Sequence, residues 1–136
     1  MGNGCFVGST LIDGGKIKDV NVGFYVMSFN HESLKLEVSQ VTHVFKKPMP
    51  QKLIKINDKI VCTFDHLFYE MEHDCYIPAH YLKLGDRLFS RILSVEIVTK
   101  LEQITPRGEN KYVYNLEVKG LNNYFANGLL VHSGCI

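Results

Sequence analysis

The chain has 136 residues, of which 46% are hydrophobic and 21% are charged, and its formal net charge is +1 at pH 7. That length is typical of one domain and is long enough to bury one apolar core. The near-neutral charge gives no electrostatic reason to expect a nucleic acid or an acidic membrane as a partner. We find no stretch that approaches the roughly 20 apolar residues of a membrane span, and residues 1–4 lack the charge and the apolar run of a signal peptide.

The four cysteines are too few and too widely spaced to indicate a disulfide scaffold or a compact metal site. They are Cys5, Cys62, Cys75 and Cys135. The six histidines are also scattered along the chain. We therefore expect neither a structural metal nor a cofactor, and we expect Cys62, which falls in an apolar run, to be an inert core thiol.

Short runs of alternating apolar and polar residues recur along the chain, with turn residues between them. In chain order, the expected strands are residues 5–11, 21–30, 34–46, 52–56, 59–64, 67–72, 86–100, 111–118 and 123–132. The clearest turn signals are residues 13–15, 30–32, 57–58 and 127–128. Residues 78–82 are the one candidate for a helical turn. The pattern predicts a single all-β domain with a sandwich or barrel-like body.

A cysteine stands near the start of the chain, directly after a glycine-rich leader. It opens the run Gly-Cys-Phe-Val-Gly-Ser-Thr at residues 4–10. Taken alone, Cys5 is as readily an ordinary thiol as a nucleophile.

A threonine and a histidine lie three residues apart at the end of an expected strand. Thr63 and His66 can therefore address one peptide group from the same side. Imidazole is the usual general acid or base near neutral pH. Taken alone, a histidine at a strand end is also compatible with a surface or capping role.

Two further segments complete the pattern. In residues 76–88, a turn at Gly85 and Asp86 leads into a strand, and we interpret this segment as structural. Residues 113–132 contain the expected last hairpin and end on His132 in a β-strand.

In this order and spacing, the four segments resemble those of the Hint superfamily, which comprises inteins, bacterial intein-like domains and the autoprocessing domain of Hedgehog proteins. Cys5 resembles the first residue of an intein, and Thr63 and His66 match its Thr-x-x-His motif. Residues 84–86 resemble the "LKxGD" segment, and residues 125–132 resemble the "FANGxxVH" ending. The likeness runs from Cys5 to His132, without a homing-endonuclease insert, and its opening most resembles the bacterial intein-like group.

The resemblance implies a compact, horseshoe-like, all-β Hint fold with pseudo-two-fold symmetry. Many short antiparallel strands and at most one or two helical turns are expected. It divides the chain into a leader (residues 1–4), an autoprocessing domain (residues 5–133) and a C-terminal flank (residues 134–136).

The resemblance also implies an N-to-S acyl shift, in which the Cys5 sulfur attacks the carbonyl of Gly4 and forms a thioester. His66 is the candidate acid that protonates the departing amide nitrogen. Thr63, through a hydroxyl donor, would hold or polarise the scissile amide. Gly4 suits the site because it adds no side chain beside the attacked carbonyl.

Three departures from the family pattern fall on its C-terminal half. Inteins end in His-Asn, whose carboxamide cyclises with assistance from the histidine, but here Ser133 follows His132. Ser133 has no carboxamide, so we expect this cyclisation to be blocked. Asn115 and Asn122 stand where the family often has Asp and His; Asn115 can hydrogen-bond but cannot act as an acid or base. We therefore expect weak coupling between the reaction at the N-terminal junction and the reaction at the C-terminal junction.

Two explanations of Ser133 remain open. It is either an engineered block or a natural variant that cleaves mainly at its N-terminal side. Ser133 or Cys135 is in principle able to accept the acyl group.

Three functions remain to be distinguished. The first is self-processing in cis, by splicing or N-terminal cleavage, in a monomer that acts on its own flanking segments without nucleic acid or membrane. The second is a catalytically inactive Hint-like module with a structural or binding role, and the third is a cysteine hydrolase that acts in trans. The resemblance implies folding in the bacterial cytoplasm within a larger precursor, whose host protein is in some cases secreted or surface-associated.

Overall fold

The structure is a computed structural model that describes residues 4–134. Residues 1–3 of the expected leader and residues 135–136 of the expected C-terminal flank, including Cys135, lie outside the described part. The strands are β1 (Phe6–Val7), β2 (Leu11–Ile12), β3 (Gly15–Lys16), β4 (Tyr25–Asn30), β5 (Lys35–Pro48), β6 (Leu53–Ile56), β7 (Ile60–Cys62), β8 (Leu67–Glu70), β9 (Cys75–Pro78), β10 (Arg87–Ser90), β11 (Ser94–Ile97), β12 (Leu101–Ile104), β13 (Tyr112–Val118), β14 (Asn123–Ala126) and β15 (Leu129–His132). Two 3-10 turns, η1 (Ile17–Asp19) and η2 (Ala79–Tyr81), are the helical elements of residues 4–134, and neither is long enough to cross a membrane.

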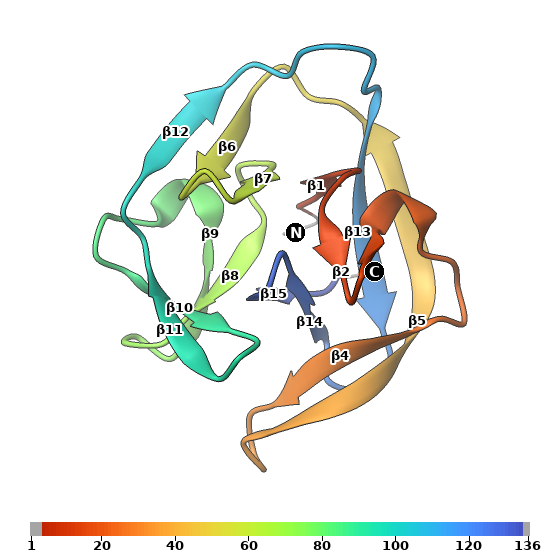
Figure 1. The fold of residues 1–136 in the computed structure, drawn as a ribbon, viewed down its shortest axis with the longest axis vertical. Helices are drawn as coiled ribbons and strands as arrows, with labels where there is room; N and C mark the ends of the chain where they lie inside the picture. Colours follow the sequence, from red (N-terminus) through yellow and green to blue (C-terminus); the bar gives the residue numbers. More distant parts are fainter. Residues whose placement is uncertain (1–3, 135–136) are drawn as a thin grey trace.

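Two curled sheets form most of the molecule (Figure 1). The first has the order β12-β6-β7-β1-β13-β5-β4, and the second has the order β11-β10-β15-β8-β9 with β14 paired to β15. Strands β2 and β3 form a separate small hairpin. In Figure 1, β1, β14 and β15 lie inside the ring of strands, β13 runs beside β5 on the right, and β4 with the lower part of β5 forms a ribbon that extends below. The first and last strands of the domain are therefore both central.

Side-chain alternation along the seven-stranded sheet separates two apolar clusters. Phe6, Cys62 and Leu116 point into the main core. Their neighbours point to the opposite face, where Cys5, Leu53 and Val113 are buried and Val7, Met49, Val61 and Ile104 pack against them. We call this second group the Cys5 cluster. As expected, Cys62 is a fully buried core thiol.

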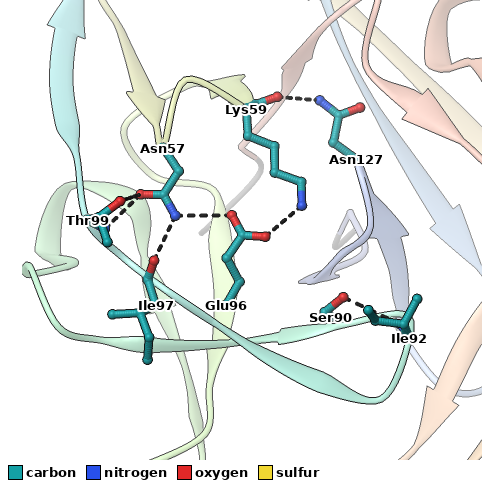
Figure 2. Close-up of polar contacts among 8 residues, drawn as sticks. All are labelled: Asn57, Lys59, Ser90, Ile92, Glu96, Ile97, Thr99 and Asn127. Carbon is teal, nitrogen blue, oxygen red and sulfur yellow. Dashed lines mark hydrogen bonds and ion pairs between the residues drawn. The ribbon is translucent and has the colours of Figure 1, made fainter.

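Two left-handed turns, one in each sheet, are joined by a hydrogen bond that links the sheets. Asn57 and Asp58 join β6 to β7, and Asn127 and Gly128 join β14 to β15; all four have positive φ, which Asn, Asp and Gly adopt most readily. The Asn127 carboxamide donates to the carbonyl of Lys59, so the end of β14 is fixed to the start of β7 (Figure 2).

Figure 2 also shows how β11 is fixed to the β6–β7 turn. The Glu96 carboxylate accepts hydrogen bonds from Asn57 at 3.1 Å and from Lys59 at 2.6 Å. Asn57 also donates to the carbonyl of Ile97 at 2.8 Å. These contacts tie the strand that leads to Thr63 to the second sheet.

The expected all-β fold is confirmed, and so is the helical turn at residues 78–82, which appears as η2. The curled, horseshoe-like sheets fit the Hint expectation better than a closed barrel or a regular sandwich. The expected strand at residues 86–100 is instead the hairpin β10–β11, because residues 91–93 turn with Leu93 at positive φ. Strands β3, β9 and β12 were missed; all three are short and follow polar or turn residues.

Candidate functional site

The strand register encloses the Gly4–Cys5 peptide between two polar side chains. Phe6 lies opposite Tyr114 in β13 and opposite Cys62 in β7. One step back along both antiparallel ladders, Cys5 comes between Asn115 and Thr63. The peptide therefore has a strand on each side, and each strand supplies one polar group to it.

Thr63 binds the nitrogen side of this peptide. The Cys5 backbone N–H donates to Thr63 Oγ1 at 2.8 Å, and the Thr63 hydroxyl donates to Asp65 Oδ1 at 2.8 Å. The threonine oxygen is thus an acceptor towards the amide. The sequence-based expectation of a hydroxyl donor at this position was wrong, because the hydroxyl proton is already directed to the exposed Asp65.

Asn115 binds the carbonyl side. Its Nδ2 donates to the Gly4 carbonyl oxygen at 2.6 Å. Its Oδ1 accepts from the Leu116 N–H at 2.7 Å and from the Tyr124 hydroxyl at 2.6 Å. A backbone N–H can only donate, so the carboxamide oxygen must face Leu116 and the NH₂ group must face Gly4. Asn115 is almost fully buried, which keeps water from competing for these bonds.

His66 is buried directly behind Gly4. A side chain at Gly4 would overlap the Cα of His66, so glycine alone fits there without displacement. Burial lowers the pKa of the imidazole to about 4, although the Gly4 backbone, the Asp65 charge and the His132 backbone partly oppose this shift. His66 is therefore a neutral imidazole at pH 7.

The Cys5 thiol is also protonated at neutral pH. Burial raises its pKa to about 11; the Lys47 charge lowers it and the Asp65 charge raises it. The thiol packs within the Cys5 cluster, whereas the His66 ring packs at a tilt of 46° against Phe6, with ring centroids 4.0 Å apart, on the opposite face of β1. Cys5 and His66 therefore flank the same peptide from opposite faces of the strand.

The end of β15 reaches the same place. The Ser133 N–H donates to the Asn122 carbonyl at 2.9 Å, and the Gly134 N–H donates to the Leu116 carbonyl at 2.6 Å. His132 Nδ1 lies 2.8 Å from the Ser133 carbonyl oxygen, a contact that requires the proton on Nδ1. Because Leu116 follows Asn115, the two junctions lie next to each other.

Unsatisfied polar atoms gather at this meeting point. Among the described residues, three buried side-chain atoms lack a hydrogen bond of good geometry: Nδ1 and Nε2 of His66, which lie near the Gly4 and His132 backbones, and Oγ of Ser133. Val131 pairs with Phe68, which brings Ser133 opposite His66 in the same antiparallel ladder. Buried polar groups without partners are rare in folded proteins and are often found at functional sites.

Five of the residues expected from the sequence thus meet at one peptide: Gly4, Cys5, Thr63, His66 and Asn115. His132 and Ser133 lie at the neighbouring end of β15. Asn122 contributes its backbone carbonyl from a left-handed turn. Asp86 lies apart from them: its carboxylate accepts the Lys83 N–H at 2.8 Å within its own turn, in agreement with the structural interpretation.

Sequence reasoning missed two members of the site. Asp65, two residues after Thr63, is well placed for a local side-chain bond of the kind that Asp favours in turns. Tyr124 is fully buried, and a buried tyrosine needs a partner for its hydroxyl. Neither signal identifies the partner without the fold.

Comparison with known proteins identifies the family and the fold. Residues 10–134 match the model of the pretoxin HINT domain. The chain belongs to the pretoxin HINT family. This HINT domain has the fold of the bacterial intein-like domain from Clostridium thermocellum, with a TM-score of 0.82 and 26% identity, over 95% of this chain and 98% of that one. It is similarly related to a DnaB intein from Synechocystis sp. PCC 6803, with a TM-score of 0.72 and 27% identity, over 97% and 99% of the two chains.

A curated relative is the uncharacterized protein MJ0781 of Methanocaldococcus jannaschii, which is 30% identical over 115 residues. That match covers 78% of this chain but only 16% of the relative's length. The family and the intein-like fold identify this HINT domain as a self-processing domain in general terms.

We expect His66 to titrate near pH 4 rather than near its ordinary value of about 6.5. Between these two pH values, the imidazole is protonated in the unfolded chain but neutral in the folded chain. The free energy of unfolding therefore decreases as the pH falls from 6.5 towards 4. The full effect is about 3 kcal/mol. NMR titration of the imidazole measures the pKa, and urea unfolding at several pH values measures the stability. The matched variant His66→Gln should lose this part of the pH dependence. An imidazole that titrates near its ordinary value would contradict the burial argument.

Proposed function

We propose that this domain converts the Gly4–Cys5 peptide into a thioester, and that attack of a nucleophile on this thioester then releases the segment that precedes Cys5. The observation that carries the proposal is that both polar atoms of one peptide are held: its carbonyl by Asn115 and its N–H by Thr63. Strand pairing alone does not require these two side-chain bonds. They suit a peptide whose carbonyl gains negative charge and whose nitrogen gains positive charge.

The first step is addition of the thiol to the carbonyl carbon. The Cys5 side chain turns from its cluster towards Gly4, a change of rotamer about χ1. Neutral His66 takes the thiol proton as the carbon–sulfur bond forms. The charge that builds on the Gly4 oxygen is stabilised by the Asn115 carboxamide, which is already oriented towards it.

The second step is departure of the amine. The imidazolium formed on His66 returns its proton to the Cys5 nitrogen, and the carbon–nitrogen bond breaks. The nitrogen becomes positively charged on the way, and Thr63 Oγ1 accepts from it. The Asp65 carboxylate behind Thr63 strengthens that acceptor. The products are a thioester on Cys5 and a free Cys5 amino group.

The C-terminal junction supports a one-sided outcome. His132 donates to the Ser133 carbonyl, the position from which it would assist cyclisation of an asparagine. Because Ser133 has no carboxamide, no succinimide forms there. We therefore propose N-terminal cleavage through the thioester as the outcome, with residues 5–133 as the processing unit and the flanks as its substrate.

Hydroxylamine tests the thioester directly. We expect it to release residues 1–4 as a hydroxamate from the intact chain, and mass spectrometry detects the loss. Cys5→Ala should release nothing, whereas Cys75→Ala, which removes an exposed cysteine, should behave like the parent chain. An unchanged mass in a folded parent chain would favour the inactive module, and cleavage of an added peptide would favour a hydrolase that acts in trans.

Asn115→Asp separates hydrogen-bond donation from mere polarity at the carbonyl. Aspartate still accepts from Leu116 and Tyr124 but cannot donate to Gly4, and its charge opposes the developing oxyanion. Loss of one oxyanion donor typically costs about 10²–10³-fold in rate, so we expect hydroxylamine release to slow by that order. Asn115→Ala is the matched variant without charge. A release rate that is unchanged in Asn115→Asp would rule out the proposed role.

Asp65 provides a second test, at the nitrogen. Asp65→Asn keeps an oxygen acceptor for the Thr63 hydroxyl but loses the charge, and Asp65→Ala loses both. We expect the release rate to fall in the order parent, Asn, Ala, with a total loss of about tenfold, as for one charge-assisted hydrogen bond. Removing the charge also lowers the pKa of the Cys5 thiol, which by itself favours attack. Slower release would therefore arise from weaker stabilisation of the Cys5 nitrogen by Thr63. An Asp65→Ala variant as fast as the parent would refute the role of Asp65 in strengthening Thr63.

A further inference from the structure

An apolar pocket opens on the face of the seven-stranded sheet that carries the Cys5 thiol. Its volume is about 520 Å³, within the usual range for small-molecule sites. Val7, Met49, Leu53, Val61 and Ile104 form the larger part of its apolar lining, and the polar side chains of Ser9, Thr105, Arg107 and Asn110 line the rest.

The pocket and the nucleophile share the same side chains. All five of these apolar residues belong to the Cys5 cluster. Val7 is two residues from Cys5 on one strand, a distance of about 7 Å along the chain, and both side chains point to the same face. The thiol is thus buried behind the side chains that line the pocket rather than inside the main core.

The proposed acyl shift would bring the thioester to this pocket. Once the acyl group is on sulfur, the Cys5 side chain can return to the rotamer that it has in the structure. The carbonyl carbon then lies with the sulfur on the pocket side of β1, while the new amino group stays at its hydrogen bond with Thr63. That separation disfavours the reverse reaction and exposes the thioester to a ligand in the pocket.

The chemistry of the site selects the ligand. Ser133 blocks the internal release step, so turnover needs an external nucleophile. Cys5 is 1% exposed, and apolar side chains lie between it and the open pocket, so a nucleophile with an apolar body that contacts them has the advantage over water. A thiol attacks as its anion, and the cations of Arg107 at the pocket and Lys47 near the Cys5 sulfur favour an anionic head group.

A second hollow, about 590 Å³ in volume, lies beside the Asn127–Gly128 turn, but it lacks these features. Its charged groups are already paired: Arg91 lies 3.5 Å from Asp13, and Lys59 lies 2.6 Å from Glu96. None of the residues lining it belongs to the Cys5 cluster.

We infer that the pocket beside Cys5 is an acceptor subsite for a small thiol with an apolar chain. The inference rests on the proposed thioester. The bound thiolate attacks the thioester carbonyl, its sulfur bonds to the Gly4 carbon, and the bond from that carbon to the Cys5 sulfur breaks. Cys5 leaves as a thiolate and takes up the proton that the incoming thiol has lost. The released product is a thioester of residues 1–4.

A homologous series of alkanethiols tests this inference, because ethanethiol, propanethiol, butanethiol and pentanethiol have almost the same intrinsic reactivity. Release of residues 1–4 is followed by mass spectrometry as a function of thiol concentration. We expect the half-saturating concentration to fall about three- to fourfold for each added methylene until the pocket is full, which is the factor for burial of one methylene. Ile104→Trp, which fills the pocket, should abolish this dependence. Ile97→Trp, on β11 and outside the pocket, should preserve it.

Hydroxylamine distinguishes failure of the subsite from failure of the thioester, because it needs no apolar contact. If hydroxylamine releases the leader but chain length has no effect, the subsite is refuted and the thioester stands. If chain length still matters in Ile104→Trp, the ligand binds elsewhere and the assignment to this pocket is refuted. If neither hydroxylamine nor any thiol releases the leader, the proposed function fails and the subsite fails with it.

Discussion

The hydrogen bonds that hold the Gly4–Cys5 peptide on both sides are the constraint on which the rest of this structure depends. One bond runs from Asn115 to the carbonyl and the other runs from the peptide N–H to Thr63. Both depend on β1 lying between β7 and β13 in the middle of a sheet. Gly4 in turn allows the peptide to pack against His66 without a clash. The fold thus holds one peptide bond in place with side chains that come from distant parts of the chain.

Burial gives the site its resting state. The imidazole is neutral and the thiol is protonated, because neither charge is favourable away from water. The two groups also lie on opposite faces of β1. Proton transfer between them therefore has to accompany movement of the cysteine side chain, and a folded chain can keep its peptide intact until that movement occurs. Burial and side-chain position together would make the reaction slow to begin without making it impossible.

The sequence predicted much of this arrangement, and the failures have physical causes. Alternation and turn residues predicted an all-β domain, and the spacing of Thr63 and His66 predicted that both address one peptide. The pattern did not show which way the Thr63 hydroxyl points, because that depends on Asp65. It also presented Asn115 only as a departure from the family. Its value as a donor becomes visible once the Gly4 carbonyl is seen in front of it, a contact between residues 111 positions apart.

The carbonyl carbon of Gly4 reports most directly on the central claim. Labelled with ¹³C and observed by NMR in the Cys5→Ala chain, it should give one amide signal, displaced to lower field by the Asn115 hydrogen bond. That displacement should disappear when Asn115 is also replaced by alanine, while the rest of the spectrum shows that the fold is kept. The signal should keep its displacement when Cys75, which lies away from the site, is replaced instead. A Gly4 signal at the position of an unfolded peptide, indifferent to Asn115, would contradict the account.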